Sequence, residues 1–156
     1  MIIKAPKILN RISKYTMGML VFPFILVRYT PPTPFANITI NHEKIHFRQA
    51  WELLVIGFYL QYAIEFLINL VRYKNKHMAY RAISFEQEAY ANQFNLKYLQ
   101  ERQPYAWFEY LGKELPQPKI YPTVYYKQIK GYEKNISNSS RGSEYRLFES
   151  HIRKHS

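Results

Sequence analysis

A short segment in the first third of the chain carries the residues best suited to chemistry. His42-Glu43-Lys44-Ile45-His46 has the pattern H-E-x-x-H. On a helix, residues four apart lie about one turn from each other, so both imidazoles can reach a single ion. Glu43 is rotated by about 100° from His42 and can reach a water molecule on that ion. The motif therefore predicts a metal site with His42 and His46 as ligands and Glu43 as the general base.

A third ligand has to come from another part of the chain, because catalytic zinc sites use three protein ligands and keep one position open. All 11 acidic residues are glutamates and cysteine is absent, so the candidates are few. Glu65 would lie too far along the same helix. Glu86 shares a helix face with several alanines, where a carboxylate is costly unless a cation compensates it. We expect Glu86 to be the third ligand, with Glu88 as the alternative. Glu88 itself is expected to face solvent and to pair with Arg81.

The two histidines begin a stripe of residues at helical spacing. The stripe continues through His46, Gln49, Leu53, Ile56, Leu60, Ile64, Leu67 and Val71. Such a stripe is typical of a helix face that packs against a core, so we expect one helix from His42 to about Val71, with a bend at Gly57. A second arc of the same helix is expected to face water, and it holds Gln61, Glu65, Asn69 and Arg72.

Shorter elements are expected on both sides of this helix. Before it, the sequence predicts a buried strand over Leu20–Val27, a proline-rich loop over 29–34, a strand over Phe35–Ile40 and an N-cap at Asn41. After it, the sequence predicts a helix over 78–102, ended by Pro104, and a short helix over 105–113. The fold class predicted from these elements is mainly α, within the α+β class.

The composition indicates one domain followed by a polar tail. The 156 residues are 47% hydrophobic, enough for a single core. We expect a domain over residues 1–130. Residues 131–156 are rich in Asn, Ser, Arg and Gly, and we expect this basic tail to be disordered. The absence of cysteine excludes disulfides, thiolate metal sites and a cysteine nucleophile.

Together the two motifs resemble the gluzincin branch of zinc metallopeptidases. The H-E-x-x-H sequence is followed by Glu86-Gln87-Glu88-Ala89, and the pair is most similar to branches whose second motif reads E-x-E-A-D or E-x-E-A-N. The resemblance covers roughly a third of the chain, from about residue 38 to residue 94. It implies a zincin-like fold in which the H-E-x-x-H helix packs on a glutamate helix, with short N-terminal strands.

The resemblance also implies an activity and a set of residue roles. One Zn²⁺ would be held by His42, His46 and Glu86, and Glu43 would serve as the base in hydrolysis of a peptide or protein substrate. Tyr90 stands where those families have Asp or Asn, and its phenol is expected to accept a hydrogen bond from a ligand histidine. The candidates for a donor to the developing oxyanion are Tyr90, Tyr80 and His77.

Charge and hydropathy leave other roles open. The net charge is +11, which favours anionic surroundings. The basic, tyrosine-rich segment Lys119–Tyr132 belongs to no recognised nucleic-acid module, so nucleic-acid binding is disfavoured. Trp51–Val71 is apolar but contains Glu52 and Glu65, which favours a cytoplasmic globular protein and keeps attachment to a membrane surface as the alternative. The competing class of function is a non-catalytic, structural zinc-binding protein. The sequence gives no indication of oligomeric state.

Overall fold

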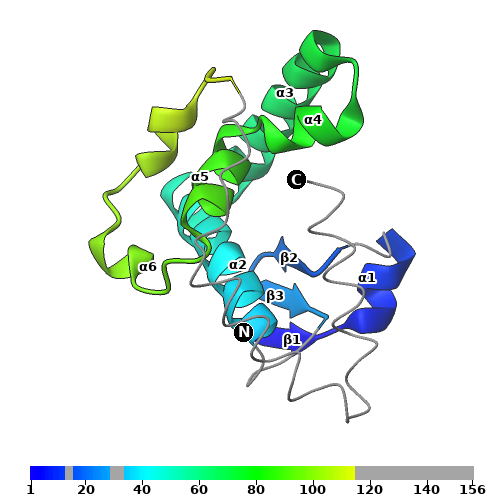
Figure 1. The fold of residues 1–156 in the computed structure, drawn as a ribbon, viewed down its shortest axis with the longest axis vertical. Helices are drawn as coiled ribbons and strands as arrows, with labels where there is room; N and C mark the ends of the chain where they lie inside the picture. The colour runs from blue at the N-terminus through cyan, green and yellow to red at the C-terminus, as the bar shows by residue number, and fades with distance from the viewer. Residues whose placement is uncertain (13–15, 29–33, 115–156) are drawn as a thin grey trace, which may run out of the picture. The chain divides into compact units, whose positions relative to one another are not determined.

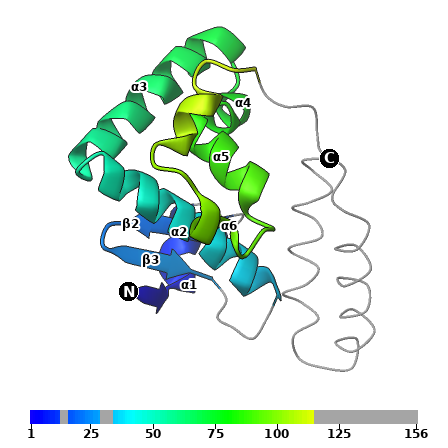
Figure 2. The same cartoon turned by 90° about the vertical axis from the view of Figure 1, so that its left-hand side faces the viewer.

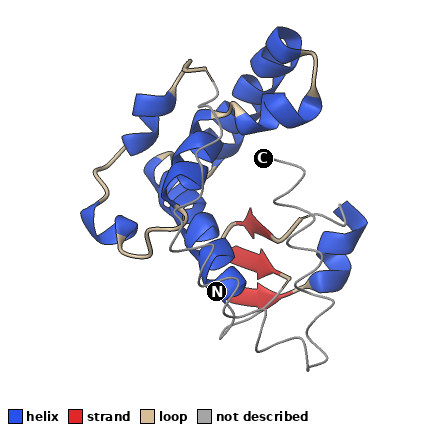
Figure 3. Cartoon of the chain, in the orientation of Figure 1, coloured by secondary structure: helices blue, strands red, loops and turns tan. Residues whose placement is uncertain are grey.

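A computed structural model describes residues 1–12, 16–28 and 34–114 of the chain. The fold is mainly helical with a small sheet near the N-terminus, which confirms the predicted α+β class (Figure 3). Met1–Leu115 form one compact unit. The predicted domain boundary at residue 130 and the predicted tail over 131–156 lie outside the described residues.

The sheet has three strands in the order β1-β3-β2. β1 (Ile2–Lys4) pairs in parallel with β3 (Phe24–Val27), and β2 (Gly18–Val21) pairs with β3 in antiparallel fashion. The segment predicted as one strand is therefore most of a hairpin. α1 (Pro6–Ile12) connects β1 to the hairpin and contacts β3. β2 lies at an edge of the sheet, where the helix α2 (Pro34–Glu52) packs against it (Figure 1).

α2 (Pro34–Glu52) contains the segment that we predicted as a strand. The prediction of a strand over Phe35–Ile40 is wrong, because these residues form the first turns of the helix. Proline is well suited to the first turn of a helix, where its missing N–H is not needed. Ala36, Ile38 and Ile40 are all buried, so this apolar pattern serves a packed helix.

Asn41 ties α2 to a later helix instead of capping its own. It lies in the interior of α2 and is buried, so the predicted N-cap is wrong. Its side-chain amide donates to the backbone carbonyls of Gln93 at 2.9 Å and Asn95 at 3.2 Å. These carbonyls follow α5 (Ser84–Asn92), the helix that carries Glu86. The residue next to His42 therefore fixes the position of the glutamate helix.

α2 ends in a sharp bend. α3 (Ile56–Tyr73) leaves at 110° to α2, and Leu54 and Val55 between them have φ values of 53° and 64° (Figure 2). Positive φ is unusual for a β-branched residue such as Val55, so the break is a defined structural feature. The bend was predicted at Gly57, which lies inside the first turn of α3. Among the described residues, no single helix is long and apolar enough to cross a membrane. The bent α2–α3 pair reaches the required length and hydropathy when the two helices are taken together.

Three helices and a 3₁₀ turn follow α3. They are α4 (Lys76–Arg81), α5, α6 (Tyr98–Glu101) and η1 (Ala106–Tyr110). The single helix predicted over 78–102 is therefore wrong, and the helix predicted over 105–113 is a shorter 3₁₀ helix. Local hydrogen bonds explain the interruptions: the Asn75 side chain accepts from the backbone N–H groups that start α4, and Asn95 accepts from the N–H of Lys97.

The hydrophobic core joins the sheet, α2, α3 and the α5 region. Its buried members are Leu20, Ile25, Val27, Ile40, Ala50, Phe58, Ile83, Phe85 and Trp107. The rings of Phe58, Phe85 and Trp107 connect α3 to α5 and η1, with successive centroids 4.8 Å apart; the first pair is tilted and the second meets edge to face. The core thus holds together the two helices, α2 and α5, on which the predicted ligands lie.

α3 is oriented opposite to the prediction. Of the arc expected to face water, Glu65 and Asn69 are buried, Gln61 is half-buried, and Arg72 is exposed as expected. Leu60 and Val71, expected to face the core, are 61% and 78% exposed. Only the first part of the predicted stripe, on α2, faces inward. The reason is that the polar arc finds hydrogen-bond partners inside the molecule.

Glu65 is buried with several hydrogen-bond donors around its carboxylate. Its carboxylate accepts from the backbone N–H of Ser84 at 2.8 Å and from the Ser84 hydroxyl at 2.6 Å. Gln61 donates to the same carboxylate at 3.0 Å. Ser84 is the first residue of α5, so an acidic side chain of α3 satisfies an amide at that helix N-terminus.

We expect Glu65→Ala to lower the free energy of unfolding by about 2–3 kcal/mol, because it leaves buried donors without an acceptor. Chemical denaturation would measure the change. The exposed Glu101→Ala is the control and should shift stability by less than about 0.5 kcal/mol. Equal stabilities of the two variants would show that Glu65 does not anchor α5.

Candidate metal centre

The structure brings His42, His46 and Glu86 together in one buried group. One ligand atom from each residue lies within 4.8 Å of the others. The two histidines come from α2 and the glutamate from α5, and all three residues are at most 7% exposed. The group is the one expected from the sequence, and Glu86 occupies the position of the expected third ligand.

The separations of the ligand atoms fit a tetrahedral ion. The Nε2 atoms of His42 and His46 are 3.1 Å apart; that of His42 lies 3.4 Å from Oε2 of Glu86, and that of His46 lies 3.2 Å from Oε1, the other oxygen of the same carboxylate. Ligands about 2.0–2.1 Å from a tetrahedral ion are about 3.3 Å from one another. A metal ion can therefore bind at the common centre with little movement of the three side chains.

Two buried polar atoms of the group, Nδ1 of His42 and Oε2 of Glu86, have no hydrogen-bond partner among the described residues. Among the described residues, the Oε2 atom of Glu86 has no hydrogen-bond donor although it is buried. The other oxygen, Oε1, accepts a hydrogen bond from the hydroxyl of Tyr62 on α3 at 2.9 Å. A buried carboxylate oxygen without a donor is costly, and a cation at the centre of the group would compensate it.

The charges within the group shift its pKa values in opposite directions. Burial lowers the pKa of His46, but the neighbouring Glu86 carboxylate outweighs it and raises this pKa to about 9. Burial raises the pKa of Glu86, but His46 and His42 outweigh it and hold this pKa well below its usual range. A proton and a metal ion compete for such nitrogens, so the same electrostatics that favour imidazolium favour a divalent cation.

Glu43 lies beside the group and against the edge of the sheet. Its carboxylate accepts a hydrogen bond from the backbone N–H of Leu20 in β2, and it is buried. A methyl group added at Gly18 would lie 2.8 Å from the Glu43 carboxylate, so Gly18 leaves the space this side chain occupies. Burial raises the pKa of Glu43, while the charges of His42 and His46 lower it. A buried carboxylate with a raised pKa is suited to act as a base.

Gln49 orients the second histidine. The Nδ1 atom of His46 lies 2.7 Å from the Oε1 atom of Gln49, and this oxygen can only accept. His46 therefore donates through Nδ1, which leaves the lone pair of Nε2 directed at the group. The amide of Gln49 in turn donates to the Phe85 carbonyl at 3.2 Å and to Glu88 at 3.0 Å.

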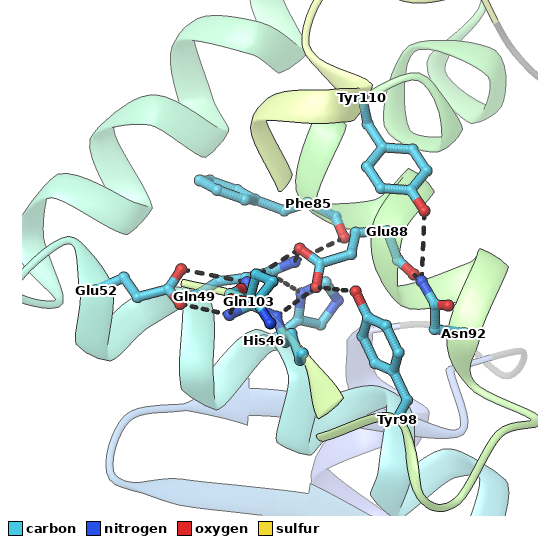
Figure 4. A network of polar contacts seen from close by, with 10 residues as sticks. His46, Gln49, Glu52, Phe85, Glu88, Asn92, Tyr98, Gln103 and Tyr110 are labelled. Atoms are coloured by element: carbon cyan, nitrogen blue, oxygen red, sulfur yellow. Dashed lines mark hydrogen bonds and ion pairs between the residues drawn. The ribbon is translucent and has the colours of Figure 1, made fainter. Parts of the chain in front are cut away.

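Glu88 belongs to a buried network behind the group, not to the solvent. It is fully buried and forms an ion pair with Arg102, which also pairs with Glu52 (Figure 4). The hydroxyl of Tyr98 donates to Glu88 at 3.0 Å. The predictions that Glu88 is exposed and pairs with Arg81 are therefore wrong. The helix ends soon after Glu88, and the returning chain brings Arg102 to it.

Tyr90, Tyr80 and His77 were predicted to assist the metal site, and they differ in how closely they approach its ligands. The ring of Tyr90 meets the His42 ring edge to face, with centroids 4.7 Å apart. Its hydroxyl lies 3.5 Å from that of Tyr80, and the Arg81 guanidinium stacks over its ring at 3.7 Å. Among the described residues the Nδ1 atom of His42 has no hydrogen-bond partner, so the predicted bond from this histidine to Tyr90 is not formed.

His77 is largely exposed on α4. Its remaining partial burial and the charge of Arg81 lower its pKa. Burial raises the pKa values of Tyr80 and Tyr90, with the Glu86 charge adding to the rise, so both phenols are neutral hydrogen-bond donors at neutral pH. The role of these three residues as oxyanion donors stays a prediction.

Two functional residues were missed in the sequence. Tyr62 contacts the ligand carboxylate from α3, and Gln49 orients a ligand histidine. The signal for Gln49 was present, because it lies three residues after His46 on the same helix face. Tyr62 had no such signal, because its contact depends on the bend between α2 and α3.

No family model, curated protein or solved structure matches the chain at a significant level. The geometry of the group is thus the basis for assigning a function. It shows a candidate metal centre of two histidines and one glutamate.

We expect Glu86→Gln to lower zinc affinity by more than about a hundredfold, because a neutral amide replaces the ligand carboxylate. Glu88→Gln is the comparison variant: it changes the other buried glutamate of α5, which reaches His46 through Gln49, and should lower the affinity far less than Glu86→Gln does. Competition with a fluorescent zinc indicator would measure both. If Glu88→Gln lost the metal and Glu86→Gln kept it, the assigned ligand would be wrong.

We expect Gln49→Ala to weaken zinc binding by about 10- to 100-fold while the fold is retained, since His46 loses the acceptor that fixes its tautomer. Gln61→Ala, which removes a hydrogen bond to Glu65 only, should leave the affinity unchanged. The same indicator titration applies, with circular dichroism to check the fold. An unchanged affinity in Gln49→Ala would contradict the orienting role.

Proposed function

We propose that this protein is a zinc-dependent metallopeptidase that hydrolyses peptide bonds. The observation that carries the proposal is the buried group of His42, His46 and Glu86, in which one ligand atom of each residue lies within 4.8 Å of the others, together with a buried carboxylate adjoining it. Two histidines and one glutamate from an H-E-x-x-H helix and a second helix form the donor set of such peptidases.

Zinc is the metal that this donor set favours. Imidazole nitrogens and one carboxylate at tetrahedral separations suit Zn²⁺, and three protein ligands leave a position for water or substrate. Magnesium and calcium prefer six or more oxygen ligands, which the group does not offer. Metal analysis of the purified protein would identify the ion, and a stoichiometric content of iron in place of zinc would contradict this assignment.

The residues of the chain then have separate tasks. Bound zinc supplies a Lewis acid that polarises the substrate carbonyl and makes water more acidic. Glu43 accepts a proton from the attacking water and passes it to the leaving amine. Its raised pKa helps the second transfer, because a protonated carboxyl has to be stable long enough to donate. Gln49 holds His46 in one tautomer, and Tyr62 holds Glu86 in its orientation.

We expect Glu43→Gln to retain zinc and to lose peptidase activity by about 10²–10⁴-fold, because the amide cannot accept the proton. Release of fluorescein from labelled casein would measure activity, and elemental analysis would measure zinc. Glu101→Gln, at an exposed position, is the control and should keep both.

Two outcomes would contradict the proposed activity. One is a Glu43→Gln variant as active as the wild type. The other is a wild-type protein that binds a full equivalent of zinc and cleaves neither the casein nor a quenched peptide library, which would favour the structural, non-catalytic role.

A further inference from the structure

The outer face of α3 is an exposed stripe of aliphatic side chains. We call this face the α3 stripe, and it consists of Ile56, Leu60, Ile64, Leu67, Ile68 and Val71. Each of these residues is at least 44% exposed, and two of them are about 80% exposed. The stripe runs the length of the helix, about 23 Å at the rise of an α-helix. None of its members is polar.

The opposite face of α3 holds the polar residues. Tyr62 and Glu65 point toward α5, where they bond to Glu86 and Ser84. The inner face also carries Phe58 and Phe66 of the hydrophobic core, so α3 is apolar on both faces, which is unusual for a surface helix. An uncovered aliphatic face of this length is costly in water, so a partner is expected to cover it.

The two ends of the stripe differ in chemistry. At the bend, Trp51 is 64% exposed and stacks on Phe22, while Leu54 and Tyr59 are exposed beside it. At the other end, Lys74 and Lys76 are exposed, and so is Arg72, which forms an ion pair with Glu114 at 3.5 Å. Aromatic and cationic residues flank apolar segments at the interface between lipid and water. A net charge of +11 adds attraction to anionic headgroups.

The composition of the stripe favours lipid over a protein partner. Protein interfaces are enriched in aromatic residues, Met and Arg at their centres, and they carry hydrogen bonds across the contact. The centre of the α3 stripe is leucine and isoleucine alone, with no donor or acceptor in its side chains. Hydrocarbon requires no such groups, and aliphatic side chains partition into it favourably.

We propose that the α3 stripe is a membrane-docking surface, by which the protein binds an anionic lipid bilayer with α3 lying in the plane of the interface. Only the outer face of α3 enters the lipid, because its inner face packs on α4 and α2 and bonds to α5. The basic residues at its C-terminal end contact the headgroups. This proposal is independent of the zinc chemistry.

Flotation of the full chain with lipid vesicles tests the proposal. We expect binding to phosphatidylcholine vesicles that contain phosphatidylglycerol, with weaker binding at high salt or without the anionic lipid. Leu60→Gln/Leu67→Gln should lower the partition coefficient by at least about tenfold, because the variant loses two leucine side chains that the lipid would bury. The control Leu96→Gln/Leu111→Gln changes two exposed leucines outside the stripe and should bind as the wild type does.

Tryptophan fluorescence provides an independent readout. The chain has two tryptophans, and Trp107 is only 3% exposed whereas Trp51 is 64% exposed. Anionic vesicles should shift the emission of the wild type to the blue, and Trp51→Phe should abolish the shift while flotation persists. A shift that survives in Trp51→Phe would contradict insertion near the bend.

Three results would overturn the proposal. The first is a wild-type protein that does not float with anionic vesicles, and the second is a stripe variant that floats as well as the wild type. The third is a dimer in size-exclusion chromatography that Leu60→Gln/Leu67→Gln dissociates without any binding to lipid, which would make the stripe an interface between two copies. The stripe variant should keep its zinc, so these results do not bear on the peptidase proposal.

Discussion

A negative charge removed from water is the constraint on which the arrangement of this protein depends. Glu86 is 3% exposed and lies on a helix whose residues 84–89 are all buried. A carboxylate in such surroundings has to be compensated within bonding distance. The imidazoles of His42 and His46 provide the compensation, either as cations or as co-ligands of one. α2 and α5 must therefore stay in a fixed relation, and much of the remaining structure serves that relation.

α5 is held by a separate hydrogen-bonded contact at each end and along its length. Glu65 of α3 binds the Ser84 N–H at its start, and Asn41 of α2 binds carbonyls just after its end. Between them, Gln49 connects the ligand His46 to Glu88. Glu86 and Glu88 lie about 200° apart on a helix, so they face different partners. One carboxylate points to the candidate metal centre, and the other organises the network that supports it.

The candidate site could be predicted where it depends on local geometry. The spacing of His42 and His46 on a helix, and the alanine-rich face around Glu86, required no knowledge of the tertiary fold. Glu88 could not be placed in the same way. Its partner Arg102 lies 14 residues further along the chain, after α6. A solvated ion pair with Arg81, which is nearer in sequence, was therefore the simpler interpretation. The strand predicted over 35–40 failed for a related reason, because its alternation of apolar residues also suits a helix that packs on both sides.

The orientation of α3 shows what periodicity does not determine. A hydrophobic period identifies two arcs of a helix, but the arc that faces inward is decided by the partners available there. Glu65 accepts from the backbone N–H of Ser84 and Tyr62 donates to the Glu86 carboxylate, so these two polar side chains of α3 lie inward with hydrogen bonds made. The aliphatic arc is then left on the surface. The helix that presents the α3 stripe on its outer side therefore contributes to the candidate metal centre on its inner side, where the Tyr62 hydroxyl donates to the ligand carboxylate.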